Sequence, residues 1–313
     1  MPEVDILLAA YNGEKFIGEQ IESILAQTFQ DFRLVIRDDG SSDNTPAIIE
    51  DYAAKYPGKI EVVRDDVVCK SPTKNFFELL KHAEAEYVMF SDQDDYWLPY
   101  KLEAILWHMK EAERDNPGKP VMVFTGFEVV DEHLHSMKIL GSVDVPEYLY
   151  SFNTMLMMNN CVAGCTEMIN RALYESMGGY DDRCGYHDAY SALYASALGV
   201  IVHVAMASIK YRQHANNDTG YSGGGGGNDT LLKIAKSYVK RWKRFPHLLG
   251  RAQLFRERFS EQLSPENLEL LDKFIALLSK NRLSRFLTLI TGRYPVPGRL
   301  AFKIKFITKA MLC

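Results

Sequence analysis

Tyr87-Val88-Met89-Phe90-Ser91-Asp92-Gln93-Asp94-Asp95 is the stretch that decides the fold of this 313-residue chain. An apolar run followed at once by a polar cluster is typical of a buried strand that ends at an open sheet edge. The crowded carboxylates repel one another, so we expect a cation among them. Oxygen ligands suit a hard divalent ion, Mn2+ or Mg2+, which commonly accompanies a phosphate. For an isolated Asp-x-Asp motif, the alternative is a solvated acidic turn.

The sequence on either side of this stretch alternates between strand and helix patterns. Predicted strands cover residues 4–10, 32–37, 60–63, 87–90, 121–124 and 200–204. Predicted helices cover residues 15–27, 45–56, 76–85, 101–112, 170–177 and 187–198, and residues 148–158 form a helix or an irregular segment. Short links between alternating elements specify an α/β fold with a mostly parallel, Rossmann-like sheet and helices on both faces.

Polar clusters follow three of the predicted strands. They are Asn12-Gly13, Asp38-Asp39-Gly40 and the acidic cluster at residues 92–95. In parallel sheets, ligands bind beyond the carboxyl ends of the strands. The three clusters therefore predict one site at one edge of the sheet.

Composition limits the class of protein. The chain is 47% hydrophobic, enough for one substantial domain with an appendage. It contains no apolar run of membrane-spanning length, and its acidic N-terminus argues against a signal peptide. The 5 cysteines form no Cys-x-x-Cys pair, which favours reduced thiols in a cytosolic protein. A zinc site built from Cys161, Cys165 and His187 is a minor alternative.

Charge is distributed very unevenly along the chain. Residues 231–313 hold 18 Lys and Arg against 5 Asp and Glu; subtraction from the totals of 36 and 41 leaves 18 basic and 36 acidic residues elsewhere. A glycine run at 223–227 marks the change. We therefore expect a catalytic domain at 1–220, a linker at 221–230 and a basic helical region at 231–313.

The basic region contains two segments, 234–249 and 300–312, in which Lys and Arg alternate with aromatic and aliphatic residues. Basic amphipathic helices of this kind bind anionic membrane surfaces. The alternative is a helical cap packed on the acidic domain. Nucleic acid is excluded as a partner, because a catalytic part with a net charge near −18 would repel it. A homodimer is left open.

Five motifs occur in order between residues 3 and 219, and each is a weak signal alone. They are Tyr11-Asn12-Gly13, Arg37-Asp38-Asp39-Gly40-Ser41-Ser42-Asp43-Asn44-Thr45, Ser91-Asp92-Gln93-Asp94-Asp95-Tyr96-Trp97, Tyr186-His187-Asp188 and Tyr211-Arg212-Gln213-His214-Ala215-Asn216-Asn217. Together they resemble family 2 glycosyltransferases, nucleotide-sugar enzymes with the GT-A fold. Residues 92–95 with Trp97, and residues 212–214, look most like the rhamnosyltransferases of bacterial cell-wall and capsular polysaccharide assembly.

This resemblance implies a role for each site residue. The residues expected to contact the nucleotide sugar are Ala10, Tyr11, Asp39, Lys74, Asp92 and Gln93. Asp39 would accept a hydrogen bond from the pyrimidine imide, and Tyr11 would stack on the base. The alternative role for Asp39 is to cap the next helix, and the alternative for Tyr11 is to pack under its own loop. For Lys74 the alternative is a solvated side chain.

Asp94 and His214 are the implied metal ligands. Asp188 is the implied general base, and capping of its helix is the alternative role. Trp97 is expected to pack beneath the acceptor pocket rather than to stack on a sugar. Gly164 lies in a loop of small residues that would approach the sugar closely.

The predicted activity is an inverting, Mn2+- or Mg2+-dependent transfer of L-rhamnose from dTDP-rhamnose to a lipid-linked saccharide. The place would be the cytoplasmic face of a bacterial plasma membrane. Ala189-Tyr190 replaces the aromatic pair that usually follows His-Asp in the relatives, which leaves the acceptor open. Alternatives are a UDP-hexose donor, a sugar-nucleotide-binding paralogue without activity, and a membrane-surface scaffold.

Overall fold

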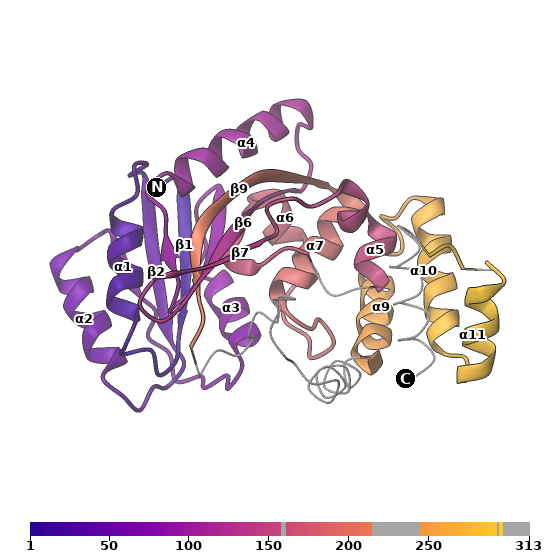
Figure 1. Ribbon diagram of the computed structural model, residues 1–313, viewed down its shortest axis with the longest axis horizontal. Coiled ribbons are helices and arrows are strands. Elements are labelled where there is room, and N and C mark those ends of the chain that lie inside the picture. Colours follow the sequence, from indigo (N-terminus) through magenta and orange to yellow (C-terminus); the bar gives the residue numbers. More distant parts are fainter. Residues whose placement is uncertain (158–160, 215–244, 293, 297–313) are drawn as a thin grey trace.

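The computed structural model describes residues 1–157, 161–214, 245–292 and 294–296. The described chain builds one curved sheet with helices on both faces, and a group of C-terminal helices extends one end (Figure 1). The strands are β1 (Val4–Ala10), β2 (Phe32–Asp38), β3 (Ile60–Val62), β4 (Tyr87–Asp92), β5 (Tyr96–Trp97), β6 (Val121–Val130), β7 (Ser136–Gly141), β8 (Glu167–Asn170) and β9 (Val200–Arg212).

The strand order is β3-β2-β1-β4-β8-β6-β9-β5, with β7 paired to β6. The pairings among β3, β2, β1 and β4 are parallel, as the alternation predicts. Strand β8 was not predicted, and it runs antiparallel between β4 and β6. The sheet is therefore parallel in its N-terminal half and mixed beyond β4, and the α/β class with helices on both faces is confirmed.

The helices follow the predicted rhythm closely. They are α1 (Ile17–Leu25), α2 (Thr45–Lys55), α3 (Pro72–Leu80), α4 (Lys101–Asp115), α5 (Phe152–Met157), α6 (Arg171–Ser176) and α7 (His187–Leu198), with 3-10 turns η1 (Glu147–Tyr150) and η2 (Gly164–Thr166). Helix α3 begins four residues earlier than the prediction of residue 76, since the Ser71 hydroxyl caps it and Pro72 occupies its first position.

Alternate residues of the central strands pack into two separate cores. Leu7 and Val88 face the core that contains α3, α5 and α7. Ile6 and Met89 face the core that contains α1 and α4. Because strand side chains alternate between faces, an almost continuous apolar run is the pattern required to bury both faces.

Three helices complete the described chain: α9 (Phe245–Phe259), α10 (Pro265–Leu278) and α11 (Arg282–Ile290). Phe255 of α9 and Phe274 of α10 are fully buried in the same core as Phe152 of α5 and Tyr194 of α7. Helices α9 and α10 lie beside α5 and α7, α11 follows on the outer side of α10, and all three lie away from β1 and β2 (Figure 1). The predicted linker, 221–230, and most of the predicted membrane-binding segments, 234–244 and 300–312, lie outside the described residues.

Candidate active site

The strand register brings the three polar clusters together. Ala10 is paired with Asp38, and Ala9 with Asp92, so the ends of β2, β1 and β4 lie side by side. The site predicted at this edge of the sheet is therefore assembled by backbone pairing alone.

Hydrogen bonds between loops fix the turn after β1. The backbone N–H of Asn12 donates to Ser41 Oγ, its side-chain Oδ1 accepts from the Ser42 N–H, and the Gly13 N–H donates to Thr45 Oγ1, each at 2.8 Å. Asn12 itself has a positive φ of 47°, a conformation that asparagine tolerates better than most residues.

Gln93 holds the backbone of Tyr11 with both ends of its amide. The Tyr11 N–H donates to Gln93 Oε1, and Gln93 Nε2 donates to the Tyr11 carbonyl, both at 2.8 Å. The Tyr11 ring is 56% exposed, so it does not pack under its own loop. This leaves the ring open for the stacking role implied by the resemblance.

Asp39 is buried, and its carboxylate is engaged by the chain itself. Its two oxygens accept the backbone N–H groups of Cys69 at 2.6 Å and Lys70 at 2.7 Å, and Arg37 donates to it at 3.2 Å. Its own N–H donates to the carbonyl of Ala10. Asp39 therefore does not cap α2, whose N-cap is Asn44. In this conformation Asp39 binds the 65–70 loop, and its contact with a base stays a prediction.

The acidic cluster after β4 divides into an outer and an inner part. In the outer part, Asp94 Oδ2 lies 2.7 Å from Nε2 of His214, the pairing expected if both serve one metal ion. In the inner part, Asp95 Oδ1 accepts the Arg212 N–H at 3.2 Å, while Oδ2 has no hydrogen-bond partner in the part of the chain that the structure describes. Burial, Asp94 and Asp92 together raise the pKa of Asp95 well above its usual value.

Arg212 joins this cluster to the rest of the domain. Its guanidinium, almost completely buried, donates to the Asp94 carbonyl at 2.8 Å and to Glu19 of α1 at 2.5 Å. Arg212 belongs to the motif at residues 211–217, which by itself predicts no contact for its side chain. Its structural role depends on β9 extending to residue 212, eight residues beyond the predicted strand end.

Lys101 lies completely buried beneath the cluster, and it was not predicted as a site residue. Its ammonium donates to the Cys165 carbonyl at 2.5 Å and lies 3.3 Å from the ring centre of Trp97. Burial lowers the pKa of Lys101 to about 7, although the negative charges of Asp95 and Asp92 act to raise it. Trp97 is itself fully buried, so it packs below the pocket, as expected, and cannot stack on a sugar.

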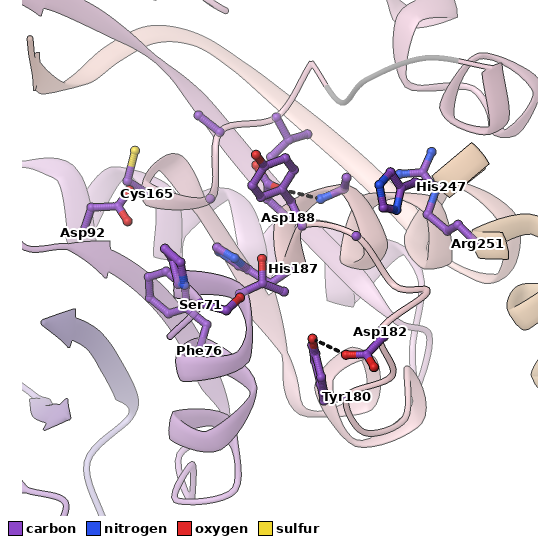
Figure 2. A pocket seen from close by; sticks show the side chains of 18 of the residues that line it. Ser71, Phe76, Asp92, Cys165, Tyr180, Asp182, His187, Asp188, His247 and Arg251 are labelled. Carbon is purple, nitrogen blue, oxygen red and sulfur yellow. Dashed lines mark hydrogen bonds between the residues drawn. The ribbon is translucent and has the colours of Figure 1, made fainter. Parts of the chain in front are cut away.

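A cavity of about 580 Å³ opens beside the cluster. Figure 2 shows Asp92 and Cys165 on one side of it, Asp188 in the middle and Arg251 on the other side. The cavity is lined by Ser71, Pro72, Thr73, Phe76, Asp92, Val162, Ala163, Gly164, Cys165, Tyr180, Asp182, Gly185, Tyr186, His187, Asp188, Ala189, Tyr211, His247, Leu248 and Arg251. The N-cap residue of helix α3, Ser71, thus lines the cavity. Lys74 lies in the first turn of the same helix and is half-buried.

Asp188, the predicted base, lies in the first turn of α7, where the helix dipole favours a carboxylate. Its Oδ1 accepts the Ala189 N–H at 2.6 Å. The N-cap position belongs to Tyr186, so Asp188 is not the cap. Nearby Glu167 is fully buried, with Oε2 lacking a partner, and burial and Asp188 raise its pKa well above the usual value.

His187 has a different position from any the sequence suggested. Its ring packs against Phe76 and Phe90, at centroid distances of 4.2 and 4.8 Å, and neither ring nitrogen has a hydrogen-bond partner among the described residues. A Cβ on Gly164 would lie 2.4 Å from His187 Nε2. Gly164 is therefore required by the approach of His187, and no zinc group of Cys161, Cys165 and His187 forms among the described residues.

The donor set around the cluster fits a divalent cation. Ligand atoms of Asp92, Asp95 and Cys165 lie within 4.8 Å of one another, and Asp94 and His214 form a second pair at 2.7 Å. The unpartnered Oδ2 of Asp95 is a buried acceptor that a cation or its water would satisfy. The carboxylates are ligands that suit Mn2+ and Mg2+, whereas the thiol of Cys165 and the imidazole of His214 are ligands that softer or borderline metals also accept.

Comparison with known proteins agrees with this geometry. Residues 5–175 match the model of Glycosyl transferase family 2. The chain is 39% identical over 99 residues to the dTDP-rhamnosyl transferase RfbG of Shigella flexneri, covering 31% of this chain and 34% of RfbG. It is 27% identical over 171 residues to the UDP-Glc:alpha-D-GlcNAc-diphosphoundecaprenol beta-1,3-glucosyltransferase WfgD of Escherichia coli, covering 54% of this chain and 61% of WfgD.

The chain thus spans about a third of the length of RfbG and about three fifths of the length of WfgD. Two solved structures share its fold at 18% sequence identity. Staphylococcus aureus TarS 1-349 in complex with UDP-GlcNAc gives a TM-score of 0.58, covering 98% of this chain and 79% of TarS. The mannosyltransferase PcManGT of Pyrobaculum calidifontis, in complex with GDP-Man and Mn2+, gives 0.55 and covers 100% of this chain and 80% of its own. The predicted GT-A fold is confirmed, and this chain belongs to glycosyl transferase family 2.

Proposed function

We propose that this protein is an inverting glycosyltransferase that moves a sugar from a nucleotide donor to a lipid-linked saccharide in polysaccharide synthesis. One observation carries the proposal: Asp92, from the acidic cluster, and Asp188, the predicted base, line the same cavity of about 580 Å³. A volume of this size accommodates the reacting sugars between a leaving-group side and a base.

The chemistry follows from these two sides. The acceptor hydroxyl gives its proton to the Asp188 carboxylate as its oxygen bonds to the anomeric carbon. The bond from that carbon to the diphosphate breaks, and the diphosphate keeps the electron pair. Attack from the side opposite the leaving group inverts the anomeric centre. Gln93 and Tyr11 hold the nucleotide end of the site in place.

Replacing Asp188 with Asn tests its role as the base. The amide keeps the size of the side chain and cannot take the proton, so we expect turnover to fall at least about 100-fold while the affinity for nucleotide changes little. Product formation and nucleotide titration measure the two effects. Turnover at the level of the unmutated protein would remove Asp188 from this role.

Asp94 and His214 would hold Mn2+ or Mg2+ at the diphosphate. When bound, the ion supplies positive charge that stabilises the departing diphosphate. Replacing His214 with Ala removes one ligand. We expect the factor by which Mn2+ increases the affinity for dTDP to be at least about tenfold smaller in this variant than in the unmutated protein. Calorimetry of dTDP with and without Mn2+ makes the measurement, and equal enhancement in both proteins would exclude His214 as a ligand.

For the donor we propose dTDP-L-rhamnose, supported by the motif resemblance and by the similarity to RfbG over 99 residues. UDP-hexose donors are the rival, because WfgD is named for UDP-Glc. Incubation with Mn2+ and a panel of dTDP-rhamnose, UDP-glucose, UDP-galactose and UDP-GlcNAc separates them. Release of dTDP alone supports our proposal, release of UDP alone supports the rival, and no release with joint nucleotide binding supports a non-catalytic paralogue.

We also propose that the region at 231–313 docks the enzyme on the anionic inner face of the bacterial plasma membrane. The support is the basic composition of this region and an apolar stripe on α11, where Leu283, Leu287 and Ile290 are 69%, 48% and 51% exposed. None of the described helices is long and apolar enough to cross a bilayer. Docking would bring the cavity to a lipid-linked acceptor.

A further inference from the structure

Helix α9 forms one wall of the cavity, although it lies outside the part of the chain that matches the family model. His247, Leu248 and Arg251 of α9 line the cavity together with Asp188. The match to the family model ends at residue 175 and the last recognised motif ends at residue 217, so neither gives a role to these side chains.

This wall is fixed in place by packing and by ion pairs. Phe255 and Ala252 are buried against the core that includes α5 and α7. Arg183, in the loop before α7, pairs with both carboxylate oxygens of Glu257 at 2.8 and 2.9 Å. Arg258 donates to the hydroxyl of Tyr190 in α7 at 2.9 Å. The position of Arg251 relative to Asp188 is thus set before any ligand arrives.

Arg251 supplies the fixed positive charge of the cavity. Among the described residues that line it, Arg251 is the only lysine or arginine, and Asp92, Asp182 and Asp188 are acidic. Arg251 is buried, with only 7% of its surface exposed, and its guanidinium donates a hydrogen bond to the carbonyl of Met155 at 3.1 Å. Burial lowers its pKa to about 10, so it remains a cation at neutral pH.

The order of groups along the cavity gives this cation a place in the reaction. Figure 2 shows Asp188 between Asp92 on the leaving-group side and Arg251 on the side of α9. An acceptor hydroxyl held by Asp188 therefore has the rest of its molecule directed toward α9. Guanidinium groups bind phosphoryl oxygens in a bidentate manner, and more strongly when partly desolvated.

On the basis of the proposed function, we infer that Arg251 of α9 binds a phosphoryl group attached to the acceptor sugar. The acceptor class is then a sugar carried on a lipid phosphate or diphosphate, and a neutral glycoside of the same sugar binds less well. Arg251 selects the acceptor, whereas the acidic cluster serves the donor.

The test compares two probes while dTDP and Mn2+ fill the donor side. Geranyl-diphospho-GlcNAc carries the phosphoryl group, and octyl-GlcNAc lacks it. We expect the unmutated protein to bind the phosphorylated probe at least about tenfold more tightly in calorimetry, the value of one charged hydrogen bond. Arg251→Gln, which removes the charge and keeps a polar side chain, should lose this preference.

Arg256→Gln is the matched control, because Arg256 lies on the exposed side of α9 and pairs with Asp272 at 2.6 Å. It should keep the preference of the unmutated protein. Loss of the preference in Arg251→Gln alone supports the inference. An equal preference in Arg251→Gln and the unmutated protein, or no preference in the unmutated protein, overturns it.

Hydrogen exchange in the unmutated protein gives a second measurement that needs no variant. The phosphorylated probe should slow exchange in residues 245–259, and the neutral probe should not; equal protection by both overturns the inference. Donor turnover is scored separately. A probe preference without turnover rejects the proposed activity only, whereas turnover without a preference rejects the role of Arg251 only.

Discussion

At the scale of single residues, the contact between Gly13 and Gln93 determines the shape of the turn after β1, where we propose that the nucleotide binds. A Cβ on Gly13 would lie 2.3 Å from Gln93 Oε1, the atom that accepts the Tyr11 N–H. The backbone of Gly13 has no positive φ, so its need for glycine comes from this contact and not from its conformation.

This geometry predicts that Gly13→Ala and Gln93→Ala have the same effect. The new methyl group displaces the Gln93 amide, and both of its hydrogen bonds to Tyr11 are lost, as they are when Gln93 is truncated. We expect each variant to weaken nucleotide binding by about 1–3 kcal/mol. Titration with dTDP and Mn2+ measures the loss.

The double variant decides whether the two changes act through one contact. We expect it to bind nucleotide about as well as either single variant, a strongly non-additive result. Losses that simply add in the double variant would mean that Gly13 and Gln93 act independently.

At the scale of elements, α7 places two neighbouring side chains in opposite environments. Asp188 faces the cavity in the first turn, while the ring of His187 packs against Phe76 of α3 and Phe90 of β4. Burial lowers the pKa of His187 to about 3. The start of α7 is thus anchored by a neutral ring, and the Asp188 carboxylate beside it lines the cavity.

This anchoring predicts a pH-dependent cost to stability. The unfolded chain binds a proton at His187 near pH 6.5 and the folded chain only near pH 3, so stability falls as the pH drops through this window. His187→Phe keeps a ring and cannot titrate. Between pH 7 and pH 5, we expect the unmutated protein to lose about 2 kcal/mol more unfolding free energy than this variant.

Urea unfolding at the two pH values measures the difference. His133→Asn is a suitable control, since that side chain is 70% exposed and lies away from α7. An equal pH dependence in the unmutated protein and His187→Phe would show that the histidine is not held neutral.

At the scale of the whole molecule, α9 and α10 share one core with the catalytic sheet, although charge divides the chain sharply. Deleting residues 231–313 would therefore expose Phe152 and Tyr194, and it is no clean test of membrane docking. The apolar stripe of α11 offers a better test, because its leucines are already exposed.

We predict that Leu283→Ser, Leu287→Ser and Ile290→Ser, made together, weaken binding to phosphatidylglycerol vesicles at least about tenfold. The reason is that the stripe would insert while basic residues contact the anionic surface. Flotation with vesicles makes the measurement. Met137→Ser with Leu140→Ser removes exposed apolar side chains from β7 and should change nothing; equal flotation of all three proteins would refute docking through α11.

Much of the catalytic half could be predicted because local patterns determine it. The apolar run before Asp92 has to be a buried strand, and the glycine and aspartate clusters have to follow strand ends. Strand β1 and helix α7 have the predicted bounds, and Asp92 and Asp188 face one cavity as the motifs suggested. The family and its α/β fold were therefore determined by the sequence itself.

Only the tertiary structure decided which partners the buried charges have. Lys101 beneath Trp97, the engagement of Asp39 by the 65–70 loop, and Arg251 in the cavity wall all join segments far apart in the chain. Periodicity reports which face of an element is buried, but not which distant group meets it there. Strand β8, which runs antiparallel between β4 and β6, was not predicted for the same reason. Its four residues are too few to show a clear strand pattern, and its position depends on the strands on either side.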